Sequence, residues 1–197
     1  MCKILLSEVQ YEVTVPTVAD RIGQQVVKAR IEGELEGLFH PDSYGYRLNK
    51  SAADAVAVTR ERCWKYDWCV EFDIRRAFDE LDWDLLRKAI RKHVKDPWAL
   101  LYIERWLTAP AVSVDGKTVQ RTKGVPQGSV IGPVLMNLYM HYTFDAWMQR
   151  EHPRNPFARY GVGLFLMHRL TVETGCFSRA PRMAPSQGID CACFSAP

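Results

Sequence analysis

Residues 155–168 read NPFARYGVGLFLMH, an apolar run that contains an Arg-Tyr pair and no acidic residue. Upstream, the run VEFDIRRAF places Asp73 at the end of another apolar stretch. An acid at the end of a buried strand is costly unless a cation or hydrogen bonds compensate it. In such a setting an acid usually shares the cation with a second acid. The sequence therefore raises the question of which residue is the partner of Asp73.

The composition is that of an ordinary globular protein. The chain has 197 residues and a mass of 22.6 kDa, and 47% of its residues are hydrophobic and 25% charged. This length allows one good core, or a core with a small second lobe. The net charge of +3 is a faint argument for an acidic partner, because 26 basic residues are nearly balanced by 23 acidic ones. Any nucleic-acid hypothesis therefore depends on where the charges lie.

The cysteines and the hydrophobic pattern indicate a soluble, cytoplasmic protein. The six cysteines are scattered, with no CxxC pair and no neighbouring histidine at zinc spacing, so we interpret them as reduced thiols. The N-terminal apolar stretch is followed at once by Glu8 and Glu12 and has no small-residue cleavage site. No segment approaches the roughly 20 apolar residues that a membrane span needs.

The periodicity of the first half predicts two helices and a strand. Residues 17–39 show a helical pattern. Its apolar positions are Ile22, Val26, Ile31 and Leu35. A second helix begins at Ser51, with Asp54 as the acid of a capping box, and ends before the short apolar strand WCVEFDI.

The second half predicts three more helices and a hairpin. Amphipathic helices are predicted over residues 83–94 and 97–107, and a long apolar helix over residues 129–150. VSVDGKTVQ predicts a hairpin with its turn at Asp115-Gly116. Because helices and strands alternate irregularly around at least one buried strand, the predicted fold class is α+β.

FDIRRAFDELDW is the most informative run. A Mg²⁺ ion would compensate the acid, because it is a hard cation that takes oxygen ligands and often shares them with phosphates. Asp73 is the candidate ligand, with the backbone carbonyl of Ile74 beside it. The alternative is a carboxylate that caps the following turn, and this run alone does not separate the two.

Two further runs could hold phosphates. In KGVPQGSVIGPVLMN, Gly124 and Gly128 flank a Pro-Gln turn at a helix N-terminus, where N–H groups and the Gln127 amide face any ligand. Alone, this run more often is a plain helix-entry loop. In HPDSYGYRLNK, Arg47 and Lys50 lie in a turn before a helix and could hold a triphosphate or template phosphates. A solvated loop is an equal alternative.

The order of PTVADRIGQQ, FHPDSYGYR, FDIRRAFDELDW, GVPQGSVIGPVLMN and PFARY resembles the reverse transcriptase of group II introns and its retron-type bacterial relatives. The resemblance covers residues 15 to about 160. It implies the fingers and part of the palm of a right-hand polymerase, with the thumb absent. It also implies RNA-directed DNA synthesis with Mg²⁺, on an RNA template such as intron RNA, with a DNA primer and a dNTP.

The resemblance also implies roles for individual residues. Asp73 would bind both metal ions, and the carbonyl of Ile74 would be a further ligand. Phe78 matches the aromatic residue that floors the sugar pocket and rejects a 2′-hydroxyl, although plain core packing is the alternative. The remaining matches are Gln127 to the glutamine that touches the incoming nucleotide, and Arg47 and Lys50 to basic positions of the fingers.

The chain departs from the family after Tyr160. The family continues with Ala-Asp-Asp, whose acids supply the remaining metal ligands, whereas this chain continues with Gly161-Val162-Gly163. The partner of Asp73 is therefore absent from its expected place, and we predict doubtful Mg²⁺ binding and polymerisation at or near zero. A shift of reading frame just after Tyr160 is one hypothesis. The run GVGLFLM can still form the next palm strand, which would preserve the fold without the chemistry.

These patterns divide the chain into three segments. Residues 1–14 do not look like the family's segment before PTVADR, residues 15–168 are the fingers and palm unit, and residues 169–197 are predicted to be a disordered tail. An inactive reverse transcriptase unit is the first hypothesis. The second is a non-catalytic protein that binds intron RNA through its basic helices, notably at residues 87–92, and the third is an α+β unit without activity.

Overall fold

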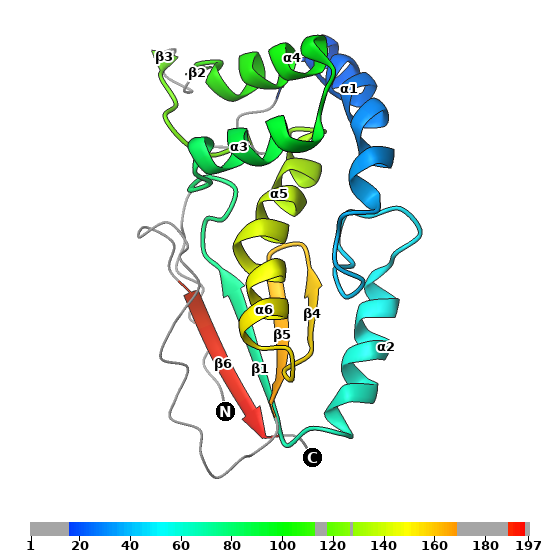
Figure 1. Cartoon of the computed structure of the whole chain (residues 1–197). Helices are drawn as coiled ribbons and strands as arrows, with labels where there is room; N and C mark the ends of the chain where they lie inside the picture. The colour runs from blue at the N-terminus through cyan, green and yellow to red at the C-terminus, as the bar shows by residue number, and fades with distance from the viewer. Residues whose placement is uncertain (1–15, 113–117, 127, 169–188, 196–197) are drawn as a thin grey trace.

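The computed structural model describes residues 16–112, 118–126, 128–168 and 189–195. Within these ranges helices alternate with a small antiparallel sheet, which confirms the α+β class (Figure 1). The helices are α1 (Val18–Glu36), α2 (Ala52–Cys63), α3 (Trp83–His93), α4 (Pro97–Thr108), α5 (Gly132–Met140), η1 (His141–Asp145) and α6 (Ala146–Glu151). The strands are β1 (Trp68–Ile74), β2 (Ala111–Val112), β3 (Thr118–Val119), β4 (Phe157–Tyr160), β5 (Gly163–His168) and β6 (Ile189–Ser195).

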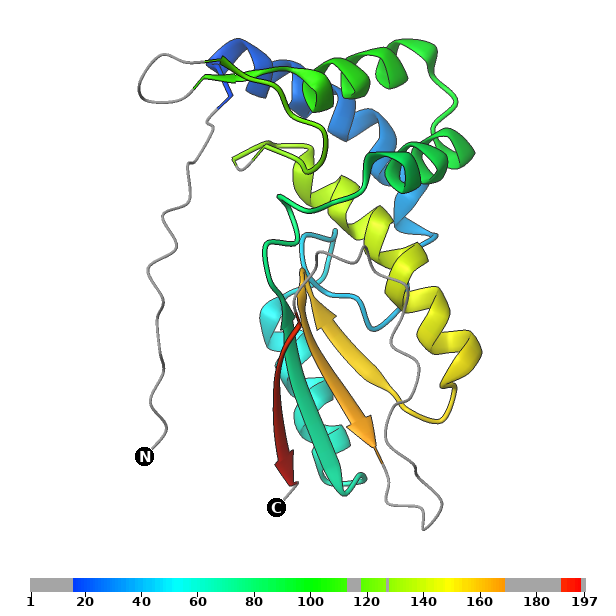
Figure 2. The same cartoon turned by 90° about the vertical axis from the view of Figure 1, so that its left-hand side faces the viewer.

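The larger sheet has the strand order β4-β5-β1-β6 and is antiparallel throughout. β1 pairs with β5 from Trp68 opposite His168 to Asp73 opposite Gly163. β4 and β5 form a hairpin that closes where Tyr160 pairs with Gly163. The apolar run after Tyr160 is thus the strand beside Asp73, as predicted, and Figure 2 shows these strands side by side.

β6 differs from the predicted disordered tail. Residues 189–195 pair with β1 along its whole length, from Ile74 opposite Ile189 to Trp68 opposite Ser195. An edge strand is held by its backbone ladder, so it does not need the alternation of polar and apolar residues that the prediction required. Residues 169–188 lie outside the described part of the chain, and the division into three segments stays a prediction.

The buried face of α1 is only partly the predicted one, since Ile31 and Leu35 are buried as predicted. Val27, Ile31 and Leu35 are buried, whereas Ile22 and Val26 are 63% and 58% exposed. The three buried residues are spaced four residues apart. Val26 comes one residue before Val27, which turns its side chain by about 100° around the helix axis and away from the buried face. The remaining position of the buried face is Gln24, a polar residue that the apolar pattern does not select.

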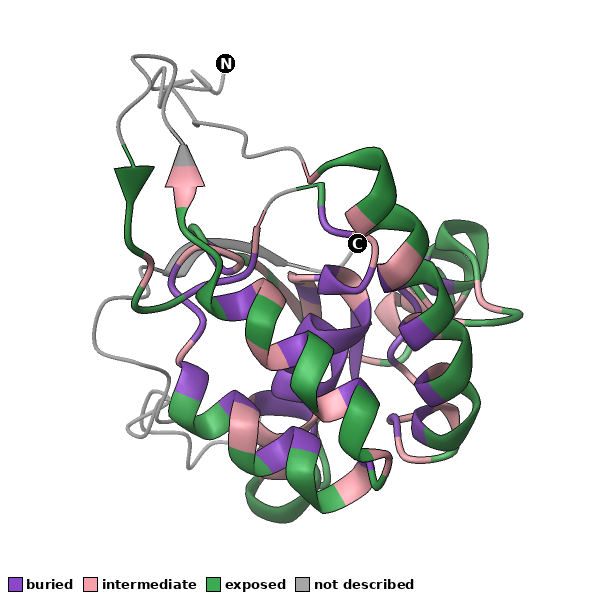
Figure 3. Ribbon diagram, turned by 90° about the horizontal axis from the view of Figure 1, so that it is seen from above, coloured by how far each residue is buried: buried purple, intermediate pink, exposed green. Residues whose placement is uncertain are grey.

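The predicted long helix over residues 129–150 is a continuous run of α5, η1 and α6. Nearly all of α5 is buried, and it packs against α1 and α3. Its proline lies in the first turn, where the missing N–H is not needed. Figure 3 shows these buried residues behind the exposed outer faces of the flanking helices.

The predicted hairpin after α4 is confirmed in its strands. Ala111 pairs with Val119 and Val112 with Thr118, while the turn itself lies outside the described residues. Among the residues that the structure describes, we find no helix that could span a membrane.

Candidate functional site

Asp73 lies near the end of β1 and is exposed. On one side its register partner is Gly163 of β5, and on the other it is Asp190 of β6. The Oδ1 atom of Asp73 is 3.9 Å from the position that a Cβ atom at Gly163 would occupy. Position 163, where the resemblance predicts an aspartate, is therefore directly beside Asp73 and holds a glycine.

The turn between β4 and β5 consists of two residues, Gly161 and Val162. Gly161 has a φ of 64°, and Val162 is not among the residues with positive φ. A two-residue hairpin loop with glycine first and positive φ only there is typical of a type II′ turn. A Cβ atom at Gly161 would lie 3.1 Å from Cε2 of Tyr46. Glycine at this position therefore serves both the backbone conformation and the close contact.

The loop before α2 holds this turn in place. Tyr44 N–H donates to the carbonyl of Arg159 (2.8 Å), and Arg159 N–H donates to the carbonyl of Asp42 (2.9 Å). A Cβ atom at Gly45 would lie only 2.1 Å from the nitrogen of Gly161. The Asn137 side-chain amide donates to the Gly45 carbonyl (2.8 Å). Segments that are far apart in the sequence thus meet at the hairpin.

The buried ion pair between Arg159 and Asp145 also holds the hairpin of β4 and β5. Arg159 is 0% exposed and Asp145 1% exposed. The Arg159 guanidinium donates twice to Asp145, at 2.9 and 2.8 Å, once to Oδ1 of Asn137 at 3.0 Å and once to the carbonyl of Gly161 at 2.8 Å. The last bond reaches the turn itself, so the ion pair holds the backbone beside Asp73.

The glycine-rich loop docks on the segment after β1. Gly124 N–H donates to the Leu81 carbonyl (2.8 Å), and Val125 N–H donates to the Phe78 carbonyl (2.7 Å). Gly124 has a φ of 79°, and a Cβ atom there would lie 2.3 Å from the carbonyl oxygen of Asp79. The loop is therefore joined to the run FDIRRAFDELDW. Gln127, its predicted nucleotide contact, lies outside the described residues.

The entry to α5 is held by a residue of α1. The Gln24 side chain is buried, and its Oε1 atom accepts hydrogen bonds from the Ser129 hydroxyl (3.0 Å) and the Val130 N–H (2.7 Å). These two bonds link the run PTVADRIGQQ of α1 to the helix-entry loop.

Phe78 and Ile74 are partly and fully buried, respectively. Phe78 packs against the hydrophobic core, as the core-packing alternative requires. Ile74 is buried and its backbone lies in register with Ile189. Both predicted roles stay predictions.

Arg47 and Lys50 are engaged by the protein. The Arg47 guanidinium makes five hydrogen bonds, to the Glu36 carboxylate and carbonyl and to the carbonyls of His40 and Ser43, at 2.6 to 3.2 Å. Lys50 donates to the Pro41 carbonyl (2.6 Å) and lies over the Tyr44 ring. All five N–H donors of Arg47 are used, so this geometry favours a structural role, and a nucleotide contact would require their rearrangement.

A second basic group borders the segment after Asp73. Arg76 lies 3.8 Å from both Asp79 and Glu80, and Lys123 contacts Glu80. Burial lowers the pKa of the Arg121 guanidinium, and the charge of Asp79 opposes this shift. The cations here are largely compensated by neighbouring acids.

The hairpin residues beside Asp73 do not supply the acids of a two-metal site. Val162 and Gly163 offer no side-chain oxygen, and within the described ranges no group of three His, Cys, Asp or Glu side chains could hold a metal ion. Two divalent ions need several shared carboxylates to overcome their repulsion. We therefore derive no catalytic step through magnesium in this chain.

The sequence interpretation missed the buried network of Asn137, Asp145 and Arg159. Polar residues inside the otherwise apolar runs GPVLMNLYM and PFARY could have indicated this network. Buried polar groups must be paired, so these residues needed partners. The pairing itself joins α5, η1 and β4, which no local pattern reveals.

An antiparallel sheet with an aspartate at one strand end, a tight hairpin beside it and a glycine-rich loop leading into a helix is consistent with the partial palm of a right-hand polymerase. Two solved structures share the fold. Telomerase from Candida tropicalis has a TM-score of 0.52 at 14% identity, over 75% of this chain and 34% of that chain. Telomerase from Candida albicans has a TM-score of 0.51 at 12% identity, over 77% and 30%.

The sequence comparisons give the family. The family model described as "Reverse transcriptase (RNA-dependent DNA polymerase)" matches residues 8–165, so this chain belongs to the reverse transcriptase family. Its curated relatives include group II intron proteins. Protein YkfC of Escherichia coli is 30% identical over 70% of this chain, and the group II intron-encoded protein LtrA of Lactococcus lactis is 29% identical over 64%. The chain spans 37% and 21% of these two relatives.

Proposed function

We propose that this chain is the fingers and part of the palm of a group II intron type reverse transcriptase that does not polymerise by itself. The observation that carries the proposal is the pairing of Asp73 with Gly163 at the strand end. The family match and the shared fold support the proposal, and position 163, where the resemblance predicts the second acid, holds a glycine.

The geometry supports a loss of polymerase activity with the fold of the hairpin retained. The hairpin is clamped by Arg159, Asn137 and the Gly45 loop, so its turn has a defined position. A defined turn without carboxylates cannot bring two metal ions to a nucleotide. RNA template, DNA primer and dNTP are the partners that the family membership suggests, and a cytoplasmic location and a folded unit over residues 15–168 belong to the same proposal.

Primer extension tests the proposal. The purified chain is incubated with an oligo(dT)-primed poly(rA) template, dTTP and Mg²⁺, and we expect no extended product. LtrA from Lactococcus lactis under the same conditions serves as the control for the assay. Extended product from this chain that disappears in an Asp73→Asn variant would overturn the proposal, because that product would require a working site at Asp73.

Binding of RNA without catalysis is a second function that one observation favours. The exposed face of α3 carries a row of basic residues. A nucleic acid can bind such a row by its phosphates, with no need for metal ligands.

A further inference from the structure

The positive charge of the chain is concentrated in one segment. Residues 83–95 contain five Lys or Arg residues and one Asp, a net charge of +4, whereas the whole chain has a net charge of +3. The rest of the chain therefore carries a net charge of −1. A field from one concentrated patch attracts a polyanion far more than the same charge spread over the surface.

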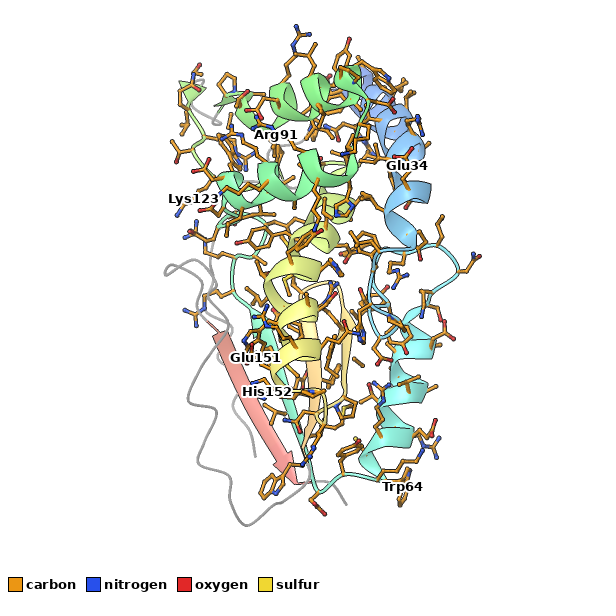
Figure 4. The ribbon with its side chains drawn as sticks, viewed as in Figure 1. Glu34, Trp64, Arg91, Lys123, Glu151 and His152 are labelled. Atoms are coloured by element: carbon orange, nitrogen blue, oxygen red, sulfur yellow. The ribbon has the colours of Figure 1, made fainter. Side chains whose placement is uncertain are left out.

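Four of these cations form one exposed row. Lys88, Arg91, Lys92 and Lys95 are exposed and lie on or just after α3. Lys88, Arg91 and Lys92 recur at intervals of three and four residues, so they share one side of α3. Lys95 follows just after Val94, the extended residue that ends the helix. Figure 4 shows Arg91 on α3, at the opposite end of the molecule from Trp64 and His152.

The row differs from several cations on the other helices because its members form no ion pair in the described part of the chain, although the charge of Arg91 acts on Glu104. On α1 and α2 the ion pairs Lys28–Glu32, Arg30–Glu34 and Lys65–Glu61 join neighbouring turns. In the part of the chain that the structure describes, no member of the row lies within ion-pair distance of a carboxylate. Arg87, by contrast, binds Glu104 and Asp84 and is not part of the row.

The buried side of α3 anchors the row. Leu86, Ala89 and Ile90 are buried, and α3 packs against α5. Lys92 lies over the Tyr142 ring with its Nζ 5.0 Å from the ring centroid. A helix fixed in this way holds its cations at constant spacing, as binding to a regular row of phosphates requires.

We propose that the row of Lys88, Arg91, Lys92 and Lys95 is an RNA-binding surface that contacts backbone phosphates, separate from the strand end at Asp73. The inference rests on the proposed function, since family membership is the reason to name RNA among polyanions. It corrects the sequence hypothesis of residues 87–92 by removing Arg87 and adding Lys95.

Fluorescence anisotropy with a labelled oligo(U) tests this surface across about 50 to 200 mM salt. The row variant carries Lys88→Gln, Arg91→Gln, Lys92→Gln and Lys95→Gln. We expect its affinity to fall at least about tenfold and the slope of log affinity against log salt to decrease by about 3, since each lost phosphate contact removes a little under one unit.

A charge-matched control separates the surface from net charge. Exposed cations at the other end of the molecule provide it, in a variant with Arg60→Gln, Lys65→Gln, Arg150→Gln and Arg154→Gln. We expect near-normal affinity and slope from this control, and circular dichroism verifies that both variants are folded.

Three results would contradict the inference. Equal losses in the row variant and the control would show that only net charge matters, while leaving RNA binding by the chain intact. If polyglutamate displaced the labelled oligo(U) as effectively as unlabelled oligo(U) does, the row would be a binding surface for acidic polypeptides. Absence of RNA binding by the unmodified chain would remove the RNA-binding function itself, and the inference with it.

Discussion

Arg159 is a charged residue with no exposed surface, and its pairing shows how single residues hold the site. Removing one partner of a buried ion pair leaves the other charge uncompensated in a medium of low polarity. Asp145 would then lose both of its bonds to the guanidinium, and the Gly161 carbonyl would lose its donor.

We therefore predict that Arg159→Met lowers the free energy of unfolding by about 3–5 kcal/mol, measured by urea denaturation. The matched control is Arg150→Met. Arg150 is 72% exposed and paired with Glu151 at the surface, so its loss should cost no more than about 1 kcal/mol. Similar small effects for both variants would contradict the structural role of Arg159.

Glycine at the turn gives a second prediction at the same scale. Gly161→Ala introduces a Cβ atom at a positive φ and at 3.1 Å from the Tyr46 ring, and should destabilise the protein by about 1–2 kcal/mol. Gly33→Ala is the control, because Gly33 lies within α1 with no heavy atom within 4 Å of the added Cβ. That change should stabilise by up to about 1 kcal/mol. Equal effects of the two changes would refute the interpretation of the turn.

At the scale of elements, the π-helical segment η1 brings histidine to the buried side of the helical layer. Burial lowers the pKa of His141, His40 and His93. For His141 and His40 the nearby Asp145 opposes that shift, and Arg159 adds to it. Each histidine thus takes up its proton less readily in the folded chain than in the unfolded chain.

This linkage predicts that stability falls on acidification. With folded pKa values below the unfolded value, the histidine contribution is fully present above about pH 6.5 and is lost as the pH falls through the folded values. The free energy of unfolding should be lower at about pH 5.5 than at about pH 7.5. His141→Phe should weaken this dependence, because the Nδ1 atom of His141 is buried and unbonded among the described residues. A stability that is unchanged or rises on acidification would contradict the prediction.

The local sequence pattern predicted where helices and strands form better than it predicted which side of a helix is buried. The strand WCVEFDI, the strand after Tyr160 and the helix beginning at Ser51 with its Asp54 capping box are all present. The predicted buried face of α1 was right at Ile31 and Leu35 and wrong at Ile22 and Val26, because the first turns bury the polar Gln24 and Val27 instead. β6 was missed because its pairing depends on the free edge of β1 and not on its own periodicity.

At the scale of the whole molecule, the runs quoted from the sequence come together around one strand end. The loop of Gly45, the hairpin of Gly161 and the strand of Asp73 are in contact through backbone atoms. The order of the motifs was sufficient to predict the family and the absence of acids after Tyr160. It was not sufficient to predict that Arg47 binds Glu36, since that contact forms only in the folded chain.

The central claim is that this fold lacks the carboxylates that the resemblance expects at positions 162 and 163 of the hairpin beside Asp73. Gly163 can accept a side chain, since the nearest atoms to an added Cβ are the Tyr160 carbonyl oxygen at 3.7 Å and Asp73 Oδ1 at 3.9 Å. Residues directly opposite in an antiparallel pair have their side chains on the same face. An aspartate at position 163 would therefore lie beside Asp73.

Calorimetric titration with Mn²⁺, a divalent ion that suits carboxylate oxygens, measures this directly. We predict that Val162→Asp/Gly163→Asp binds Mn²⁺ at least about tenfold more tightly than the unmodified chain, and that the isosteric Val162→Asn/Gly163→Asn control gains much less. If the unmodified chain already binds two Mn²⁺ ions in a manner abolished by Asp73→Asn, or if the aspartate variant gains nothing, the account is contradicted.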